Sequence, residues 1–181
     1  MKQGVTTRQT VLVILEKDRQ ILFGKKLRGH GKGKWNGAGG TCQPDEWPEA
    51  CARREVREEL GITAMKLEPV AVLTFTQKPT IDDYSDLTTY VYLCHEWEGE
   101  PVETAELGEL TWFDADAIPY GEMWEDDTYW LPQVLAGEKV TGEFTFDSDY
   151  RMTSHKVTVN GIDRPTLDIS TRVEQILSED T

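Results

Sequence analysis

Short apolar runs alternate with polar turns along the chain, and the first of them predicts a buried strand. Residues 10–15 form an apolar run rich in β-branched side chains, a pattern typical of a strand with little contact with water. A polar turn at 16–19 separates this run from a second one at 20–23, so the pair predicts a hairpin. Further strands are predicted at residues 70–76, 89–95 and 110–113.

The segment at 47–60 changes to helical periodicity. Ala52, Val56 and Leu60 recur every four residues, which places them on one apolar face of a helix. Gly61 follows directly, at the position where a left-handed glycine commonly ends a helix. We therefore predict one strong helix in the first half of the chain.

Weaker signals complete the pattern. A glycine-rich and cation-rich stretch at 29–40 predicts a loop, and residues 129–135 predict a short helix. The ranges 140–147 and 151–159 alternate around a polar turn and predict a hairpin. Near the end, 171–177 begins with a capping box and predicts a last short helix. Strands on both sides of a strong helix predict an α/β fold class, with a mixed β-sheet sandwiched between helices.

Composition narrows the class of protein. A length of 181 residues favours one domain with a proper core. The chain carries 19 Lys and Arg against 33 Asp and Glu, which gives a formal net charge of −14. This balance argues against binding to a polynucleotide, because basic surface supplies most of that affinity. A small phosphorylated ligand stays compatible with it if a divalent cation bridges the two acidic partners.

The sequence also bears on the compartment. No run of about 18 apolar residues occurs, so we expect no membrane span. The first residues lead into a charged segment rather than an apolar one, which argues against a signal peptide. Cys42, Cys51 and Cys94 are odd in number and have no metal-ligand spacing. They predict reduced thiols in a cytoplasmic protein.

Three carboxylates gather on one side of the predicted helix. Glu55, Glu58 and Glu59 stand at i, i+3 and i+4, a spacing that brings like charges together and destabilises a helix. One interpretation is a site for Mg²⁺, which takes oxygen ligands together with substrate phosphates. Arg54 would then orient one carboxylate through a bidentate contact. The other interpretation is a solvated acidic face, the common meaning of such a run.

The pattern around these glutamates decides between the two interpretations. The segment 40–62 resembles the Nudix box at each defining position: Gly40, Glu46, Arg54, Glu55, Val56, Glu58, Glu59, Gly61 and Ile62. The resemblance covers residues 8–153 and points to MutT-type Nudix hydrolases, within them to the oxidised-purine nucleoside triphosphatases. It implies the Nudix fold as a single domain over 1–181, with 155–181 as a C-terminal extension outside the resemblance.

The resemblance implies a Mg²⁺-dependent pyrophosphohydrolase, with Mn²⁺ as a substitute metal. Such an enzyme converts oxidised purine nucleoside triphosphates, of the 8-oxo-dGTP and 2-hydroxy-dATP type, to monophosphate and pyrophosphate and so sanitises the nucleotide pool. We expect a monomer with a nucleoside triphosphate substrate and with no membrane or polynucleotide partner. The alternatives are a Nudix hydrolase acting on normal nucleoside triphosphates, ADP-ribose or capped RNA, and a nucleotide sensor without turnover. The intact box argues against the sensor.

Metal and catalytic roles carry over by position. The resemblance implies a metal site made by Glu55, Glu58, Glu59, the backbone carbonyl of Gly39 and the distal Glu106. The catalytic residues are expected to be Glu55, Glu58, Glu59 and Arg54. The general base that takes a proton from water is left open among the four glutamates. Glu46 and Arg54 are expected to fix the geometry between loop and helix.

Substrate contacts carry over in the same way: Thr10, Lys26, Asn36, Ala38, Gly39, Gly40, Thr41, Trp124, Glu125, Asp126 and Asp127. Lys26 would face the phosphates, while Asn36 and Trp124 would contact the base. If Asp126 and Asp127 share one pocket, one of them should hold a proton, because close like charges raise one pKa. The competing interpretation of this pair is a helix N-terminus, where acids are favourable. His30 departs from the family, which has Phe there.

Overall fold

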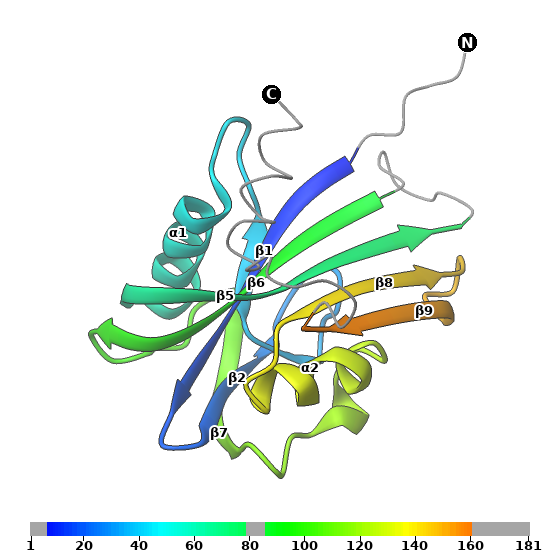
Figure 1. Cartoon of the computed structure of the whole chain (residues 1–181). Helices are drawn as coiled ribbons and strands as arrows, with labels where there is room; N and C mark the ends of the chain where they lie inside the picture. Colours follow the sequence, from blue (N-terminus) through cyan, green and yellow to red (C-terminus); the bar gives the residue numbers. More distant parts are fainter. Residues whose placement is uncertain (1–6, 79–85, 161–181) are drawn as a thin grey trace.

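The computed structural model describes residues 7–78 and 86–160. Its elements in chain order are β1 (Thr7–Lys17), β2 (Gln20–Lys26), β3 (Trp35–Asn36), β4 (Ala38–Thr41), α1 (Pro48–Leu60), β5 (Thr63–Gln77), β6 (Asp86–Glu98), β7 (Leu107–Asp114), η1 (Tyr120–Glu122), α2 (Asp127–Leu135), β8 (Val140–Phe146) and β9 (Met152–Val159). Within these ranges the strands form one sheet in the order β3-β2-β1-β6-β5-β8-β9, with β4 beside β1 and β7 beside β2 (Figure 1). The sheet is mixed, because β1 pairs with β6 and β5 with β8 in parallel, while the other pairs are antiparallel.

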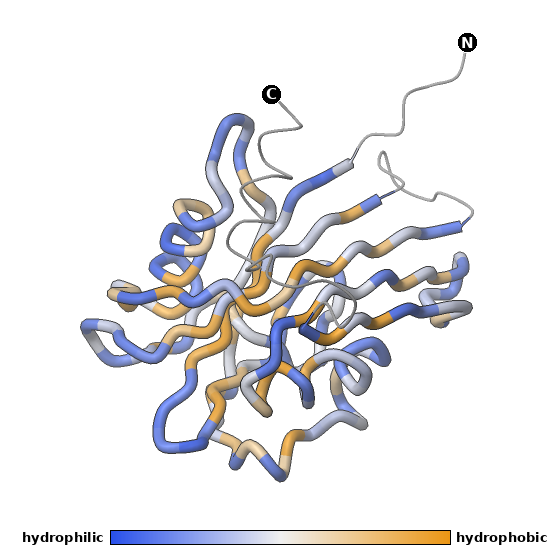
Figure 2. Tube along the Cα trace, viewed as in Figure 1, coloured by the Kyte–Doolittle hydropathy of each residue, from blue (hydrophilic) through white to orange (hydrophobic). Residues whose placement is uncertain are grey.

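Side chains of the central strand β1 alternate between two apolar cores. Val11, Val13 and Leu15 pack in the core that includes the buried face of α1. Ile14 points the other way, into the core that includes Trp130 of α2. Because successive side chains of a strand face opposite sides, a strand covered on both faces is apolar throughout. Figure 2 shows the same distribution, with apolar residues along the central strands. The expected mixed sheet between helices is confirmed.

The predicted helix at 47–60 is confirmed as α1. Ala52 and Val56 are fully buried on its inner face. Its end is also as expected: Gly61 has φ 69° and donates its N–H to the carbonyl of Arg57 over 3.0 Å. At its start, Trp47 makes no side-chain capping hydrogen bond, so the box loop is held there by other contacts.

The loop predicted at 29–40 is wrong in its second half, where the structure has β3 and β4. A Cβ at Gly39 would lie 2.1 Å from the carbonyl oxygen of Val11, and one at Gly37 would lie 2.4 Å from that of Val13. Glycine is needed here because it lets the backbone of β4 approach β1 closely. A high glycine content therefore signals close strand contact in this segment, where we expected a loop.

The remaining expected elements agree with the structure where it describes them. The expected strands at 70–76, 89–95 and 110–113 lie inside the longer β5, β6 and β7, and the second predicted hairpin is β8 with β9. The expected tail helix at 171–177 lies outside the described residues. In the described part of the chain, no helix has the length and apolar character needed to cross a membrane.

Candidate active site

A cavity of about 540 Å³ lies against the sheet between the box segment and α2. Its lining includes Lys26 and the backbone of Gly39 and Gly40, and it also includes Asp126 and Asp127. The described lining does not include Glu55, Glu58 or Glu59. It reaches this acidic group through Gly39 and Lys26, both of which contact Glu59. We call Glu55, Glu58 and Glu59 the glutamate cluster, and Asp126 with Asp127 the aspartate pair.

The glutamate cluster is largely buried. Glu55 and Glu59 are only 8% and 5% exposed, and the exposed member is Glu58. A solvated acidic face would leave all three in water, so that alternative is wrong for two of them. Burying ionised carboxylates is costly unless opposite charges or hydrogen-bond donors compensate them. Both kinds of compensation are present.

Glu59 is held by a backbone donor and a cation. Its Oε2 accepts the N–H of Gly39 over 2.9 Å, and its Oε1 lies 3.6 Å from Nζ of Lys26. Burial raises the pKa of Glu59, while the Gly39 N–H and the charge of Lys26 act in the opposite direction. The carboxylate is thus fixed next to two residues that line the cavity.

Arg54 connects the box loop to the glutamate cluster. Its Nε and Nη2 donate to the two oxygens of Glu46 over 2.8 and 2.9 Å, a bidentate pair. Its Nη1 donates to Glu55 over 2.7 Å and to Glu58 over 3.1 Å. These bonds to Arg54 lower the pKa of Glu46 to about 2. One guanidinium therefore sets the position of the loop and of two cluster carboxylates at once.

The space beside Glu55 depends on Gly40. A Cβ at Gly40 would lie 2.6 Å from the carboxylate oxygens of Glu55, so a larger residue would displace that carboxylate. The cluster carboxylates and the nearby backbone carbonyl of Gly39 form a donor set made only of oxygen. Hard divalent cations prefer such ligands, so these residues fit a divalent metal.

Glu106, expected to complete the metal site, has a different partner in this structure. Its carboxylate forms an ion pair with Arg28. Its segment is nevertheless tied to the end of α1, because the hydroxyl of Thr104 donates to the carbonyl of Glu59 over 3.1 Å. The same hydroxyl accepts the N–H of Glu106 over 3.3 Å. Among the described residues, no hydrogen bond or ion pair joins the Glu106 carboxylate to the glutamate cluster.

The aspartate pair is buried at the start of α2, with exposures of 4% and 5%. Asp126 Oδ2 accepts the indole N–H of Trp130 over 3.1 Å, and Asp127 Oδ2 accepts the N–H of Trp124 over 3.0 Å. Burial raises the pKa of Asp126 to about 6. Burial, and then the charge of Asp126, raise the pKa of Asp127 well above its usual range. The helix start is real, yet Asp126 makes no capping bond to it, and both acids line the cavity.

An aromatic group forms another wall of the cavity. His30 stacks on Trp124 with ring centres 4.7 Å apart, and Tyr150 lies 4.6 Å from His30. Lys34 Nζ lies 4.9 Å from the centre of the Trp124 ring. Tyr150 and Trp130 also line the cavity, and Trp130 is at the same time buried in the core that includes α2. Tyr150 lies in the turn between β8 and β9. No local motif in the sequence indicated it.

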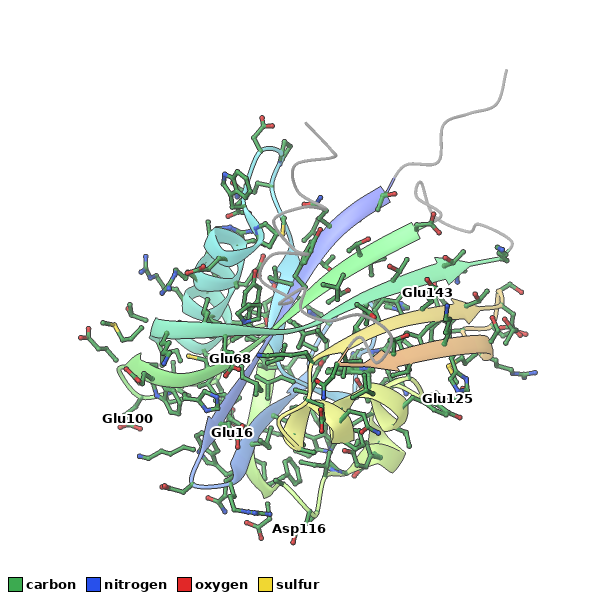
Figure 3. The ribbon with its side chains drawn as sticks, viewed as in Figure 1. Glu16, Glu68, Glu100, Asp116, Glu125 and Glu143 are labelled. Atoms are coloured by element: carbon green, nitrogen blue, oxygen red, sulfur yellow. The ribbon has the colours of Figure 1, made fainter. Side chains whose placement is uncertain are left out.

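The structure brings most, but not all, of the expected substrate residues together. Those that line the cavity are Thr10, Lys26, Asn36, Gly39, Gly40, Trp124, Asp126 and Asp127. Three others face elsewhere. Ala38 is buried in the core beside α1, and the carbonyl of Thr41 accepts a bond from Arg54 over 3.2 Å. The carboxylate of Glu125 accepts the N–H of Met152 over 3.4 Å, at the edge strand β9 (Figure 3).

Comparisons with known proteins agree with this architecture. Over 152 residues the chain is 36% identical to an oxidized purine nucleoside triphosphate hydrolase from Danio rerio, with 84% of this chain and 95% of that protein aligned. The protein of the same name from Mus musculus is 33% identical over 154 residues, with the same shares aligned. A solved MutT protein from Bacillus halodurans has the same fold, with a TM-score of 0.73 at 23% identity over 83% of this chain and 97% of that one. The model of the NUDIX domain matches residues 6–134, and the chain therefore belongs to the Nudix family of hydrolases.

Proposed function

We propose that this Nudix hydrolase is a Mg²⁺-dependent pyrophosphohydrolase that converts oxidised purine nucleoside triphosphates to monophosphates and pyrophosphate. The observation that carries the proposal is the buried aspartate pair, which shares one cavity with Lys26 and the glycine backbone of the box. The relatives from Danio rerio and Mus musculus, which are named for hydrolysis of oxidized purine nucleoside triphosphates, support the substrate class. Removing such nucleotides would sanitise the nucleotide pool.

The base is recognised by groups that both donate and accept hydrogen bonds. With raised pKa values in the aspartate pair, one carboxyl holds a proton and donates while the other accepts. Oxidised purines such as 8-oxoguanine present donors and acceptors along one edge, which suits such a pair. Asn36 adds an amide that can do both, and Trp124 supplies a flat face for stacking.

The triphosphate is bound through charge and a metal ion rather than through hydrogen bonds to a base. Lys26 contributes a positive charge beside the glycine backbone that lines the cavity. Glu55, Glu58, Glu59 and the carbonyl of Gly39 would hold Mg²⁺, with Glu106 as a further ligand after its release from Arg28. When bound, the metal supplies neutralisation of the phosphate charge and a water molecule of lowered pKa. One of the four glutamates takes the proton of the attacking water.

Arg54 has a positioning role in this proposal. It holds Glu55 and Glu58 in place while it is itself fixed by both oxygens of Glu46. We further propose one domain over residues 1–181, with 155–181 as an extension. We also propose a monomer, and a cytoplasmic location, since all three cysteines are free thiols.

A pyrophosphate-release screen with Mg²⁺ tests the proposal. The substrates are 8-oxo-dGTP, 2-hydroxy-dATP, dGTP, dATP, a normal pyrimidine triphosphate, ADP-ribose and a capped RNA. We expect the highest kcat/KM for an oxidised purine and no release in the presence of EDTA. A higher kcat/KM for a normal nucleotide or for ADP-ribose would contradict the substrate class. Tight binding without release would indicate a sensor. Replacing Mg²⁺ by Mn²⁺ checks the choice of metal.

A further inference from the structure

Two cysteines that the sequence separates lie next to each other in the box. Cys42 follows β4, and Cys51 lies in α1, with eight residues between them. Their sulfur atoms lie within 4.8 Å of each other and of a carboxylate oxygen of Glu46. A disulfide needs sulfurs about 2 Å apart, so the two side chains have to move toward each other to form one. Cys42 is partly exposed, whereas Cys51 is fully buried.

The two thiols are not equivalent. A hydrogen bond from the Cys51 thiol lowers the pKa of Cys42, and the charge of Arg54 acts in the same direction. The bond to Cys42, and then burial, raise the pKa of Cys51. A partly exposed sulfur of lowered pKa beside a buried thiol is the usual arrangement of an attacking and a resolving cysteine.

The pair is connected to the glutamate cluster through Arg54. Its Nη2 lies 3.7 Å from Sγ of Cys51 and donates to the carbonyl of Thr41, the residue before Cys42. The same guanidinium holds Glu55. A disulfide between the two sulfurs would therefore disturb the contacts of Arg54 with Cys51 and Thr41. Because Arg54 positions the carboxylate of Glu55, that carboxylate would be disturbed as well.

A metal ion fits this place less well than a disulfide does. Both oxygens of Glu46 are already engaged by Arg54. Only the two sulfurs then stay available, whereas structural zinc sites take four protein ligands. Within the described residues no further histidine, cysteine or acid joins this group.

We propose that Cys42 and Cys51 are an oxidant-modified pair that a peroxide converts to a disulfide, which reversibly lowers turnover. The Cys42 thiolate attacks the O–O bond of hydrogen peroxide, which leaves Cys42 as a sulfenic acid and releases hydroxide. The Cys51 sulfur then attacks the sulfenic sulfur, so that the S–S bond forms and water leaves. In total two thiols lose two electrons and two protons, and one peroxide is reduced to two waters.

The test is a hydrogen peroxide titration of the full chain, read by thiol alkylation with peptide mass mapping and by pyrophosphate release. We expect a Cys42–Cys51 disulfide to form first while Cys94 is still alkylated, and turnover to fall several-fold and return with dithiothreitol. Cys42→Ser should keep its basal turnover and lose the sensitivity to peroxide. Cys51→Ala should stop at a sulfenic acid on Cys42, which dimedone traps. Cys94→Ala, a buried thiol outside the pair, is the matched control and should respond like the wild type.

Several results would overturn the proposal. Three free thiols after peroxide treatment, or a disulfide between two chains, would exclude the intramolecular pair. A disulfide that leaves turnover unchanged would exclude its link to the glutamate cluster. One zinc per chain in metal analysis, with both thiols protected from alkylation, would assign the pair to a metal instead. The turnover readout depends on the proposed function, but thiol alkylation needs no substrate. If the proposed substrate is wrong, alkylation still shows whether the Cys42–Cys51 disulfide forms.

Discussion

The glutamate cluster and the aspartate pair are two acidic groups beside one cavity, and they differ in what surrounds them. Burial raises the pKa of Glu59 and of Asp127 alike. For Glu59 the next largest influences, the N–H of Gly39 and the charge of Lys26, oppose burial. For Asp127 the next largest influence is the charge of Asp126, which adds to it. The surroundings of the glutamate cluster thus stabilise the ionised carboxylates. Those of the aspartate pair favour the protonated form of one carboxyl.

This difference shows that the surroundings of an acid, and not its residue type, decide its chemistry. The cluster has Arg54 and Lys26 as cationic partners, so it can present negative oxygens to a metal. The aspartate pair receives N–H donors from an indole and from the backbone, which leaves it able to match a neutral base. Each prediction below changes one side of this comparison.

The largest expected effect comes from removing one charge of the cluster. Glu59→Gln keeps the shape of the side chain, so the fold should survive. Turnover should fall by about a thousandfold, since the metal contributes several kcal/mol of transition-state stabilisation. The measurement is pyrophosphate release against Mg²⁺ concentration, together with a melting curve. Glu49→Gln, an exposed position on the same helix, is the control. Near-normal turnover in the Gln variants of both Glu58 and Glu59 would remove them from the site.

The next effect displaces a cluster carboxylate without changing its charge. In Gly40→Ala the new Cβ would lie 2.6 Å from the Glu55 oxygens, so that carboxylate has to move while Arg54 still holds it. A misplacement of about 1 Å can cost on the order of a hundredfold in rate, and we expect a fall of that size in kcat. Gly121→Ala, where nothing lies within 4 Å of the new Cβ, should leave kcat unchanged. Equal rates in the two variants would contradict the proposed position of Glu55.

On the other side of the comparison, Asp126→Asn and Asp127→Asn change the hydrogen-bond pattern offered to the base. A buried group left unpaired costs about 1–3 kcal/mol, so kcat/KM should fall roughly tenfold to a hundredfold. The measurement is kcat/KM for 8-oxo-dGTP and dGTP, alongside melting curves. Asp116→Asn, at an exposed turn (Figure 3), is the control. Unchanged kinetics with a lowered melting temperature would assign the pair to a helix start alone.

The smallest expected effect is a pH dependence of stability that comes from Asp126. Its pKa is about 6 in the folded protein and near its ordinary value when unfolded, so between these values the folded state binds more protons. Stability from this group is therefore greatest at low pH and is lost as the pH rises through about 6. From pH 5 to 7 the loss is about 1 kcal/mol, or roughly 2 to 4 °C in Tm.

Melting curves of the wild type and of Asp126→Asn from pH 5 to 7 check the sign. The variant should gain stability relative to the wild type as the pH rises, because it has no proton to lose. A constant difference in Tm across this range would contradict a pKa of about 6 for Asp126 in the folded protein.

The sequence predicted the elements whose signal is the spacing of residues close together in the chain. The period of Ala52 and Val56 predicted α1, and Gly61 predicted where it ends. The glycines at positions 37 and 39 led to a wrong prediction of a loop, because dense glycine occurs both in loops and in closely paired strands. Only the position of β1 distinguishes the two cases.

In the candidate site, too, residues within one element could be predicted, whereas contacts between distant segments could not. The glutamate cluster lies on one helix and could be proposed from spacing, and its assignment as metal ligands stays a prediction. The contact of His30 with Tyr150 joins residues more than a hundred positions apart, and no local pattern contains it. The neighbouring positions of Cys42 and Cys51 depend on where β4 ends relative to the first turns of α1, which spacing alone does not give.

The β8–β9 hairpin lies beyond residue 134, where the match to the family's domain model ends. Yet it contributes Phe146, and the turn within it contributes Tyr150, to the lining of the cavity. Part of the cavity wall is thus encoded outside the stretch that the domain model matches, although Asn36, Trp124 and the aspartate pair lie inside it. We expect mutations in the hairpin to change the shape of this wall and to leave the box helix intact. This arrangement allows substrate preference to diverge between descendants of a duplicated gene while hydrolysis is inherited unchanged.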